Sequence, residues 1–195
     1  YRRAPEHPFP AAVHDGYAVT EWARANASDL GGSDDVVVAG DSAGGTLAAA
    51  VTLLARDRDG PTVDYQVLFY PATSERDDWD SVADPETGKL FTAADMACFG
   101  EHYLEDPLHA ANPYASPLAA CSHADLPPAT VVTAGFDPLH DEGVAYAEAL
   151  AGDGVAVAHH DYADVIHGFV SMVGRVDRAI EALEAVGEDL TDGLS

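Results

Sequence analysis

Residues 36–45 read Val-Val-Val-Ala-Gly-Asp-Ser-Ala-Gly-Gly and decide the fold. The β-branched run predicts a strand over Asp35–Ala39 that is buried on both faces. The apolar segment Thr46–Ala55 predicts a buried helix. A serine between glycines at such a strand-to-helix turn has the G-x-S-x-G pattern of a nucleophile elbow, which pushes the hydroxyl clear of the backbone. The motif predicts Ser42 as the nucleophile and the backbone N–H of Ala43 as a donor in the oxyanion hole.

Strands and helices alternate along the rest of the chain, which predicts an α/β fold with a parallel, doubly wound sheet. Residues 1–195 are predicted to form a single domain. Residues 72–126 lose clear periodicity, so we expect an excursion over the active-site edge of the sheet. Further strands are expected over Tyr65–Tyr70, Ala129–Ala134 and Val155–Asp161, and helices over Ala11–Ala25, near Ala93–Tyr103, from Leu139 to Gly152, and along a final amphipathic face of Phe169, Val173, Val176, Ile180 and Leu183.

Two later residues complete a catalytic hypothesis. A serine hydroxyl needs a base, and the base needs an orienting acid. Asp137 follows the third predicted strand and His167 follows the last one. Carboxyl ends of parallel strands meet at the edge of the sheet where ligands bind. The order therefore predicts a triad of Ser42, Asp137 and His167. Asp141 is a rival acid, which we expect instead to cap the following helix.

The charge balance excludes several partners. The chain has 34 Asp and Glu against 9 Lys and Arg, a formal charge of −25. Phosphate backbones and anionic lipids repel such a polyanion, so nucleic acid is not an expected partner. The apolar runs are too short to span a bilayer. The acids are spread along the whole chain, as expected for a solvated surface. Lys89 is the only lysine, and this near absence of lysine together with excess Asp is typical of a halophilic protein, whose surface repulsion is screened by molar salt.

Cysteine and histidine usage give two further expectations. Cys98 and Cys121 are too few for a disulfide framework. They predict free, buried or semi-buried thiols in a reducing compartment and hence a cytoplasmic location. His159 and His160 are adjacent, and adjacent strand residues point to opposite faces, so no metal site is expected there.

Four motifs add a family resemblance. They are the opening Tyr1–Ala12, the elbow Gly40–Gly45, the acid motif Asp137–Gly143 and the histidine motif Ile166–Phe169. With them the chain resembles the hormone-sensitive-lipase-like (family IV) esterases of the α/β-hydrolase superfamily over nearly its full length. The resemblance implies the α/β-hydrolase fold, Asp137 as the triad acid and His167 as the base. It also implies a serine carboxylesterase for short- to medium-chain esters, with a small-molecule ester substrate and no cofactor.

One family element is not found in these residues. The His-Gly-Gly-Gly loop, which supplies the other oxyanion N–H groups in the family, has no counterpart here, and the chain begins with Tyr1 in what resembles mid-sequence. We therefore expect an N-terminally truncated part of a longer enzyme that hydrolyses esters poorly by itself. Such a part leaves an unpaired sheet edge prone to association, with a homodimer as one form.

Two hypotheses from other classes stay open. One is an amidase or peptidase with the same triad, although the excursion carries no charged signature for binding peptide ends. The other is a non-catalytic ligand-binding homologue, which the presence of all three triad candidates disfavours. Substrate-binding residues stay unassigned, but aromatic candidates for an acyl pocket are Phe69, Tyr70, Phe91, Phe99 and Tyr103.

Overall fold

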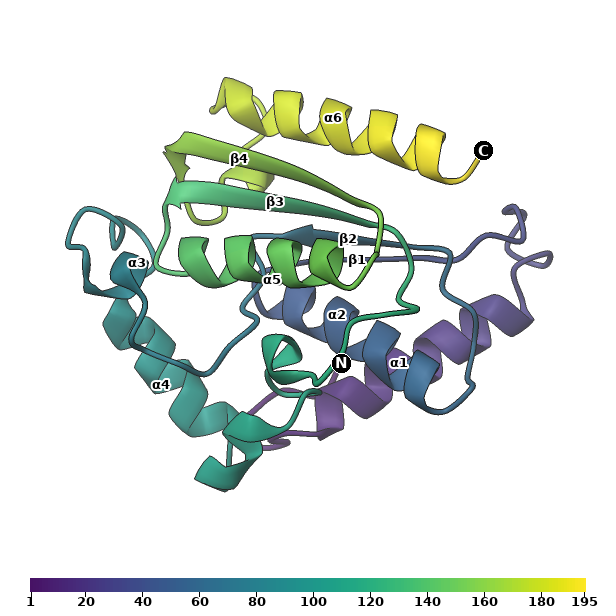
Figure 1. Ribbon diagram of the computed structural model, residues 1–195, viewed down its shortest axis with the longest axis horizontal. Coiled ribbons are helices and arrows are strands. Elements are labelled where there is room, and N and C mark those ends of the chain that lie inside the picture. Colours follow the sequence, from purple (N-terminus) through teal and green to yellow (C-terminus); the bar gives the residue numbers. More distant parts are fainter.

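A parallel four-stranded sheet forms the centre of the protein. The computed structural model describes all 195 residues. The strands lie in sequence order and each pairs in parallel with the next (Figure 1). Parallel neighbours need long crossover connections, which the intervening helical segments supply. The predicted α/β class is therefore confirmed. The strands are β1 (Val37–Asp41), β2 (Tyr65–Phe69), β3 (Ala129–Phe136) and β4 (Val157–Ile166).

Helices cover both faces of this sheet (Figure 1). Helix α6 (Asp177–Gly193) packs on one face. Helices α2 (Ala43–Asp57) and α5 (His140–Gly152) pack on the other, and α1 (Ala11–Ala25) lies against the outer side of α2. Each face thus has its own apolar core, as a doubly wound sheet requires.

Alternating side chains of one strand supply both cores. Val131 packs in the core between the sheet and helices α2 and α5, whereas Val132 packs in the core under α6. Residues 45–55 of α2 are all buried, as predicted for this helix.

The expectation that the first strand is buried on both faces is wrong, because β1 is only partly buried along its length. It lies at an edge of the sheet, where one side of the strand has no neighbour.

The final helix begins later than predicted. Phe169 lies in a 3₁₀ turn, η3 (Phe169–Ser171), and is fully buried against the sheet. Gly174 has a φ of +79°, which ends any helical path before α6 begins at Asp177. Helix α6 buries Ala179, Ala182 and Val186, while Ile180 and Leu183 are exposed. Small alanines let the helix approach the sheet closely, so the face with the largest side chains is not the buried one.

The connection between β2 and β3 carries several short elements. It includes α3 (Asp80–Ala83), α4 (Ala93–Tyr103) and the 3₁₀ turns η1 (Pro107–Ala111) and η2 (Pro117–Ala119). Figure 1 shows α3 and α4 near the end of the sheet to which the strands point. A capping box begins α4, in which Thr92 Oγ1 accepts from the Asp95 N–H at 3.2 Å and Asp95 Oδ2 accepts from the Thr92 N–H at 2.9 Å.

Cys98 and Cys121 are both free and exposed, so the expectation of buried thiols is wrong. Cys98 lies on α4, a helix that buries none of its residues because it covers a pocket instead of a core.

No helix of the protein has both the length and the apolar composition needed to cross a bilayer.

Candidate active site

Ser42 stands at a strained turn between β1 and α2. Its φ of +53° and ψ of −121° are unusual for a residue with a side chain. The Ser42 N–H donates to the carbonyl of Phe69 at 2.9 Å, which ties the turn to the next strand. Glycines make the turn possible: a Cβ on Gly40 would collide with the Gly44 carbonyl, and one on Gly45 would lie 2.8 Å from Cβ of Pro71. The local sequence therefore allows strand and helix to meet closely with the hydroxyl between them.

The three residues singled out from the sequence come together at one end of the sheet. His167 Nε2 lies 3.0 Å from Ser42 Oγ. Its other ring nitrogen, Nδ1, lies 2.6 Å from Asp137 Oδ2. Asp137 directly follows β3 and His167 directly follows β4, so parallel neighbouring strands end with their side chains within reach of one another. The arrangement forms one continuous hydrogen-bonded path from carboxylate to hydroxyl.

The surroundings hold Asp137 and His167 in place. Asp137 is fully buried, and its Oδ1 accepts a hydrogen bond of 2.9 Å from the backbone N–H of Leu139. The rings of Tyr70 and Phe91 each have centroids 4.8 Å from the imidazole of His167. Burial raises the pKa of the Tyr70 hydroxyl, so this neighbour stays neutral. The acid and the imidazole are therefore shielded from bulk water, and an ion pair in such surroundings is stronger than it would be in water.

Asp141 makes different contacts. Its Oδ2 accepts from the Ser81 N–H at 2.9 Å, and its Oδ1 lies 2.9 Å from His140 Nδ1. It has no bond to His167, and it does not cap α5, whose N-cap residue is Leu139 without a side-chain bond. The expected capping role is wrong because the carboxylate turns toward the excursion and ties α3 to α5.

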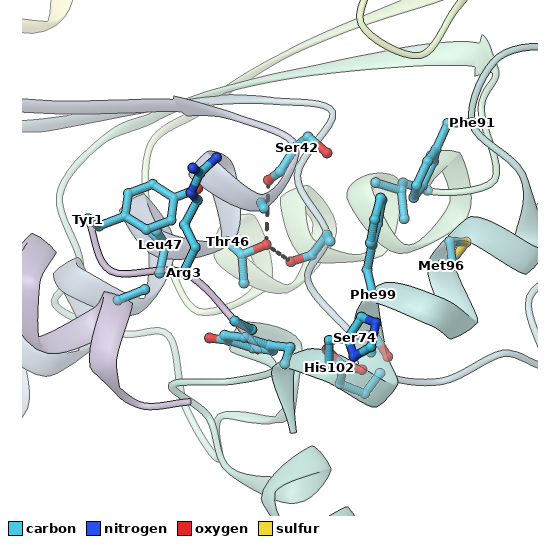
Figure 2. Close-up of a pocket in the computed structure, with 18 of the residues that line it drawn as sticks. Tyr1, Arg3, Ser42, Thr46, Leu47, Ser74, Phe91, Met96, Phe99 and His102 are labelled. Atoms are coloured by element: carbon cyan, nitrogen blue, oxygen red, sulfur yellow. Dashed lines mark hydrogen bonds between the residues drawn. The ribbon is translucent and has the colours of Figure 1, made fainter. Parts of the chain in front are cut away.

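A pocket of about 440 Å³ opens beside Ser42. Figure 2 shows Tyr1, Arg3 and Leu47 on one side of Ser42. On the other side of Ser42, the pocket is lined by Phe91, Met96 and Phe99, which belong to the excursion between β2 and β3. Three of the predicted aromatic candidates, Phe91, Phe99 and Tyr103, line this pocket, whereas Phe69 and Tyr70 do not.

Two carboxyl groups at the pocket escaped the sequence analysis. Glu142 is fully buried, and its carboxyl oxygens make no hydrogen bond of good geometry, although the backbone N–H groups of Ser74 and Thr73 lie close enough to favour the ionised form in part. Burial raises its pKa well above the usual range for a glutamic acid. Glu75 borders the open pocket, yet nearby protein atoms desolvate its carboxyl enough to raise its pKa as well. Nothing in the local sequence signals the burial of Glu142, since glutamate side chains are mostly exposed at protein surfaces.

The protein contains no cluster of three or more His, Cys, Asp or Glu side chains suited to a metal ion. The adjacent His159 and His160 have separate partners. His159 Nε2 lies 2.9 Å from Thr133 Oγ1, and His160 Nε2 lies 2.8 Å from Asp189 Oδ2 on α6. The two imidazoles thus face opposite sides of the sheet.

Known proteins resemble this chain in sequence and in structure. A family model described as alpha/beta hydrolase fold matches residues 1–171. Esterase LipI of Mycobacterium tuberculosis is 42% identical over 186 residues, which are 93% of this chain and 58% of LipI. Carboxylic ester hydrolase LipN of the same organism is 45% identical over 179 residues, 88% of this chain and 48% of LipN. The chain thus spans about half the length of these curated relatives.

Solved structures agree with the sequence matches. The carboxylesterase EstE1, cloned from a metagenomic library, superposes with a TM-score of 0.93 at 40% identity, covering 100% of this chain and 67% of that one. An esterase of Pyrobaculum calidifontis gives a TM-score of 0.92 at 42% identity, covering 98% and 64%.

Proposed function

The chain belongs to the α/β-hydrolase fold family, and from this membership and the site geometry we propose that it is a serine carboxylesterase of the hormone-sensitive-lipase-like group. The observation that carries the proposal is the path Asp137–His167–Ser42, with distances of 2.6 Å and 3.0 Å. Its esterase relatives support the same chemistry.

Each residue of the path has a chemical role in the proposal. Ser42 Oγ attacks the ester carbonyl while His167 Nε2 takes its proton, which gives a tetrahedral oxyanion. His167 then passes that proton to the departing alcohol as the carbon–oxygen bond breaks and the acyl-enzyme remains. A water molecule, deprotonated by His167, attacks the acyl carbon. His167 then returns that proton to Ser42 Oγ as the bond between Oγ and the acyl carbon breaks, which releases the carboxylic acid. Asp137 orients the imidazole and stabilises its charged form.

The oxyanion needs donors that are already in position. Ala43 is the first residue of α2, and the first N–H groups of a helix have no partner within it. The Ala43 N–H therefore points its dipole to where the charge develops, at the positive end of the helix.

The proposed substrates are short- to medium-chain esters. The pocket volume of about 440 Å³ and its lining by Phe91, Met96 and Phe99 suit an acyl chain of a few carbons. Comparing matched ester and amide substrates tests the alternative of an amidase or peptidase. Amide turnover equal to ester turnover would favour that alternative.

A fluorophosphonate probe tests the catalytic proposal directly. The protein should be labelled, and Ser42→Ala should abolish both labelling and hydrolysis of p-nitrophenyl butyrate. Ser74→Ala is the matched control, since Ser74 also lines the pocket but has no bond to His167. An unlabelled wild-type protein would support a non-catalytic binding role instead.

Composition supports two further parts of the proposal. The formal charge of −25 fits a halophilic protein that works at high salt. Two free cysteines fit a reducing, cytoplasmic setting. A homodimer through an edge strand of the sheet is also proposed, and sedimentation of the purified protein tests it.

A further inference from the structure

Two aromatic rings from different parts of the chain contact the imidazole of His167. Tyr70 is fully buried, and its backbone N–H donates to the carbonyl of Val132 at 2.6 Å, so its ring belongs to the sheet and its core. Phe91 is only half-buried and comes from the excursion between β2 and β3. Each ring has its centroid 4.8 Å from that of the imidazole. A segment that holds no member of the triad therefore contacts its base directly.

The ring of Phe91 lies against a face of the imidazole. The planes of the two rings are inclined at 30°, against 60° for Tyr70 and the imidazole. The face of an aromatic ring is negative, and it attracts a cation that lies within about 6 Å of the ring centroid. In the proposed mechanism His167 becomes such a cation when it takes the proton of Ser42. The position of Phe91 therefore suits stabilisation of the protonated imidazole.

The hydrogen bonds of His167 leave one motion of its ring weakly restrained. Nδ1 lies 2.6 Å from Asp137 Oδ2, and Nε2 lies 3.0 Å from Ser42 Oγ. Bonds at these two nitrogens resist a sideways shift of the ring, but they oppose a tilt about the line that joins the nitrogens only weakly. A second ring packed on the face opposes that tilt. In the acyl-enzyme Ser42 has no hydroxyl proton to donate to Nε2, so only Asp137 and the aromatic contacts then hold the imidazole.

The sequence after Phe91 explains how its ring is held. Thr92 and Asp95 form the capping box at the start of α4, so Phe91 directly precedes the N-cap and Met96 is the fourth residue of the helix. Apolar side chains at these two positions commonly pack together as a hydrophobic staple, which fixes the angle at which the chain enters the helix. Both side chains line the pocket on the same side of Ser42 (Figure 2).

Helix α4 is also held at its other end. The carbonyl of Tyr103, its last residue, accepts a hydrogen bond of 2.8 Å from the Phe9 N–H, and the rings of these two residues pack with centroids 5.8 Å apart. Within the helix, Phe99 stacks on Phe91 at an interplanar angle of 13°. A helix fixed at both ends thus carries Phe91 to His167.

We propose that Phe91 is a positioning residue, which keeps the imidazole of His167 aligned with Ser42 and stabilises its protonated form. This inference rests on the proposed esterase function, since His167 is protonated in the course of that reaction. A residue that only lined the pocket would affect substrates according to their acyl chains. His167 acts in the same way on every ester, so the contribution of Phe91 to kcat should be independent of the acyl chain.

Kinetics on p-nitrophenyl acetate and p-nitrophenyl hexanoate test this independence. Phe91→Leu keeps an apolar side chain without the ring, and kcat should fall about tenfold on both esters, with KM for the acetate changed by less than about threefold. Phe91→Tyr keeps the ring and should restore most of the lost kcat. A loss that appears only in KM, that differs between the two esters, or that is as large in Phe91→Tyr would overturn the inference.

The cap of α4 provides a second variant that leaves Phe91 in place. Thr92→Ala removes the capping box, so kcat should again fall by one factor on both esters. Combined with Phe91→Leu it should add no further loss, because both changes remove the same contact. Fully additive losses would contradict the shared role.

Asp106→Ala is the matched control for the loss of a cap. Asp106 Oδ1 accepts from the Leu108 N–H at 2.9 Å at the start of η1, in the same excursion but outside the pocket. This variant should keep the kcat of the wild type. A loss equal to that of Thr92→Ala would trace the effect to a general loosening of the excursion and overturn the role of Phe91.

NMR separates this inference from the proposed function. An aromatic face shifts nearby protons upfield, so the imidazole C–H resonances of His167, assigned by their absence in His167→Gln, should move downfield in Phe91→Leu and return in Phe91→Tyr. Unmoved resonances would overturn the contact. Hydrolysis that depends on Ser42 but is unaffected in Phe91→Leu would keep the esterase and refute the positioning role. The expected shifts in a protein that hydrolyses neither ester would refute the esterase proposal and keep only the hold of Phe91 on the imidazole.

Discussion

His167 Nδ1 lies 2.6 Å from Oδ2 of the fully buried Asp137. In the proposed mechanism this bond holds the imidazole in the tautomer that accepts a proton from Ser42. Asp137→Asn should therefore lower kcat on p-nitrophenyl butyrate by about 10³–10⁴-fold. Asp141→Asn is the matched control, because Asp141 has no bond to His167, and it should stay within severalfold of wild type. Equal losses in the two variants would contradict the assignment of Asp137.

Gly40 should tolerate no side chain. A Cβ at this position collides with the Gly44 carbonyl inside the elbow, so Gly40→Ala should displace Ser42, abolish probe labelling and lower Tm. Gly187→Ala provides the contrast, since a Cβ there meets nothing within 4 Å and the residue lies inside α6. It should raise the free energy of unfolding by about 0.5–1 kcal/mol. Thermal melts check both, and a neutral Gly40→Ala would refute the close contact.

Glu142 should make stability depend on pH. Its pKa in the folded state is raised by burial, so its favourable contribution is full below the unfolded pKa of about 4.3 and is lost as pH rises through the folded value. Above that pH the folded protein holds a buried carboxylate, which lowers the free energy of unfolding, and Glu142→Gln removes this ionisable group. Its Tm should equal that of wild type near pH 4 and exceed it at pH 8, while Glu101→Gln, at an exposed position of α4, should follow wild type throughout. A wild-type advantage at pH 8 would show that the carboxylate has a partner.

Salt should stabilise the protein strongly. With a formal charge of −25, surface repulsion opposes the folded state. The Debye length falls from about 10 Å in 0.1 M salt to about 3 Å in 1 M salt, which screens that repulsion. Tm should therefore rise steadily with KCl into the molar range. A flat Tm over that range would contradict a halophilic protein.

Phe99 should set the preference for longer acyl chains. Its ring lines the pocket and stacks on Phe91 with centroids 6.0 Å apart, and Phe91 in turn packs against His167 with centroids 4.8 Å apart. Phe99→Ala should lower kcat/KM for hexanoate esters several-fold more than for acetate esters, because only the longer chain reaches the ring. Leu108→Ala removes another exposed apolar side chain, outside the pocket, and should leave the ratio unchanged. An unchanged ratio in Phe99→Ala would place the acyl chain elsewhere.

Local patterns predicted most of the architecture. The helix Ala11–Ala25 and the helix Ala93–Tyr103 have the bounds expected from sequence. The predicted strands all exist, although β4 runs on to Ile166 and so delivers His167 directly from its end. These elements follow from side-chain periodicity, prolines and glycines, which act over a few residues. Their positions along the chain were enough to select Ser42, Asp137 and His167 as the residues to test.

By itself, then, the sequence determined the order of strands and helices, the glycine turn around Ser42 and the candidates for acid and base. Only the tertiary structure decided which face of α6 is buried, because close approach to the sheet favours Ala179 and Ala182 over the larger, exposed Ile180 and Leu183. It also decided that the carboxyl of Glu142 is fully buried. Burial and pairing depend on atoms distant in sequence, and no local pattern records what the rest of the chain brings to a residue.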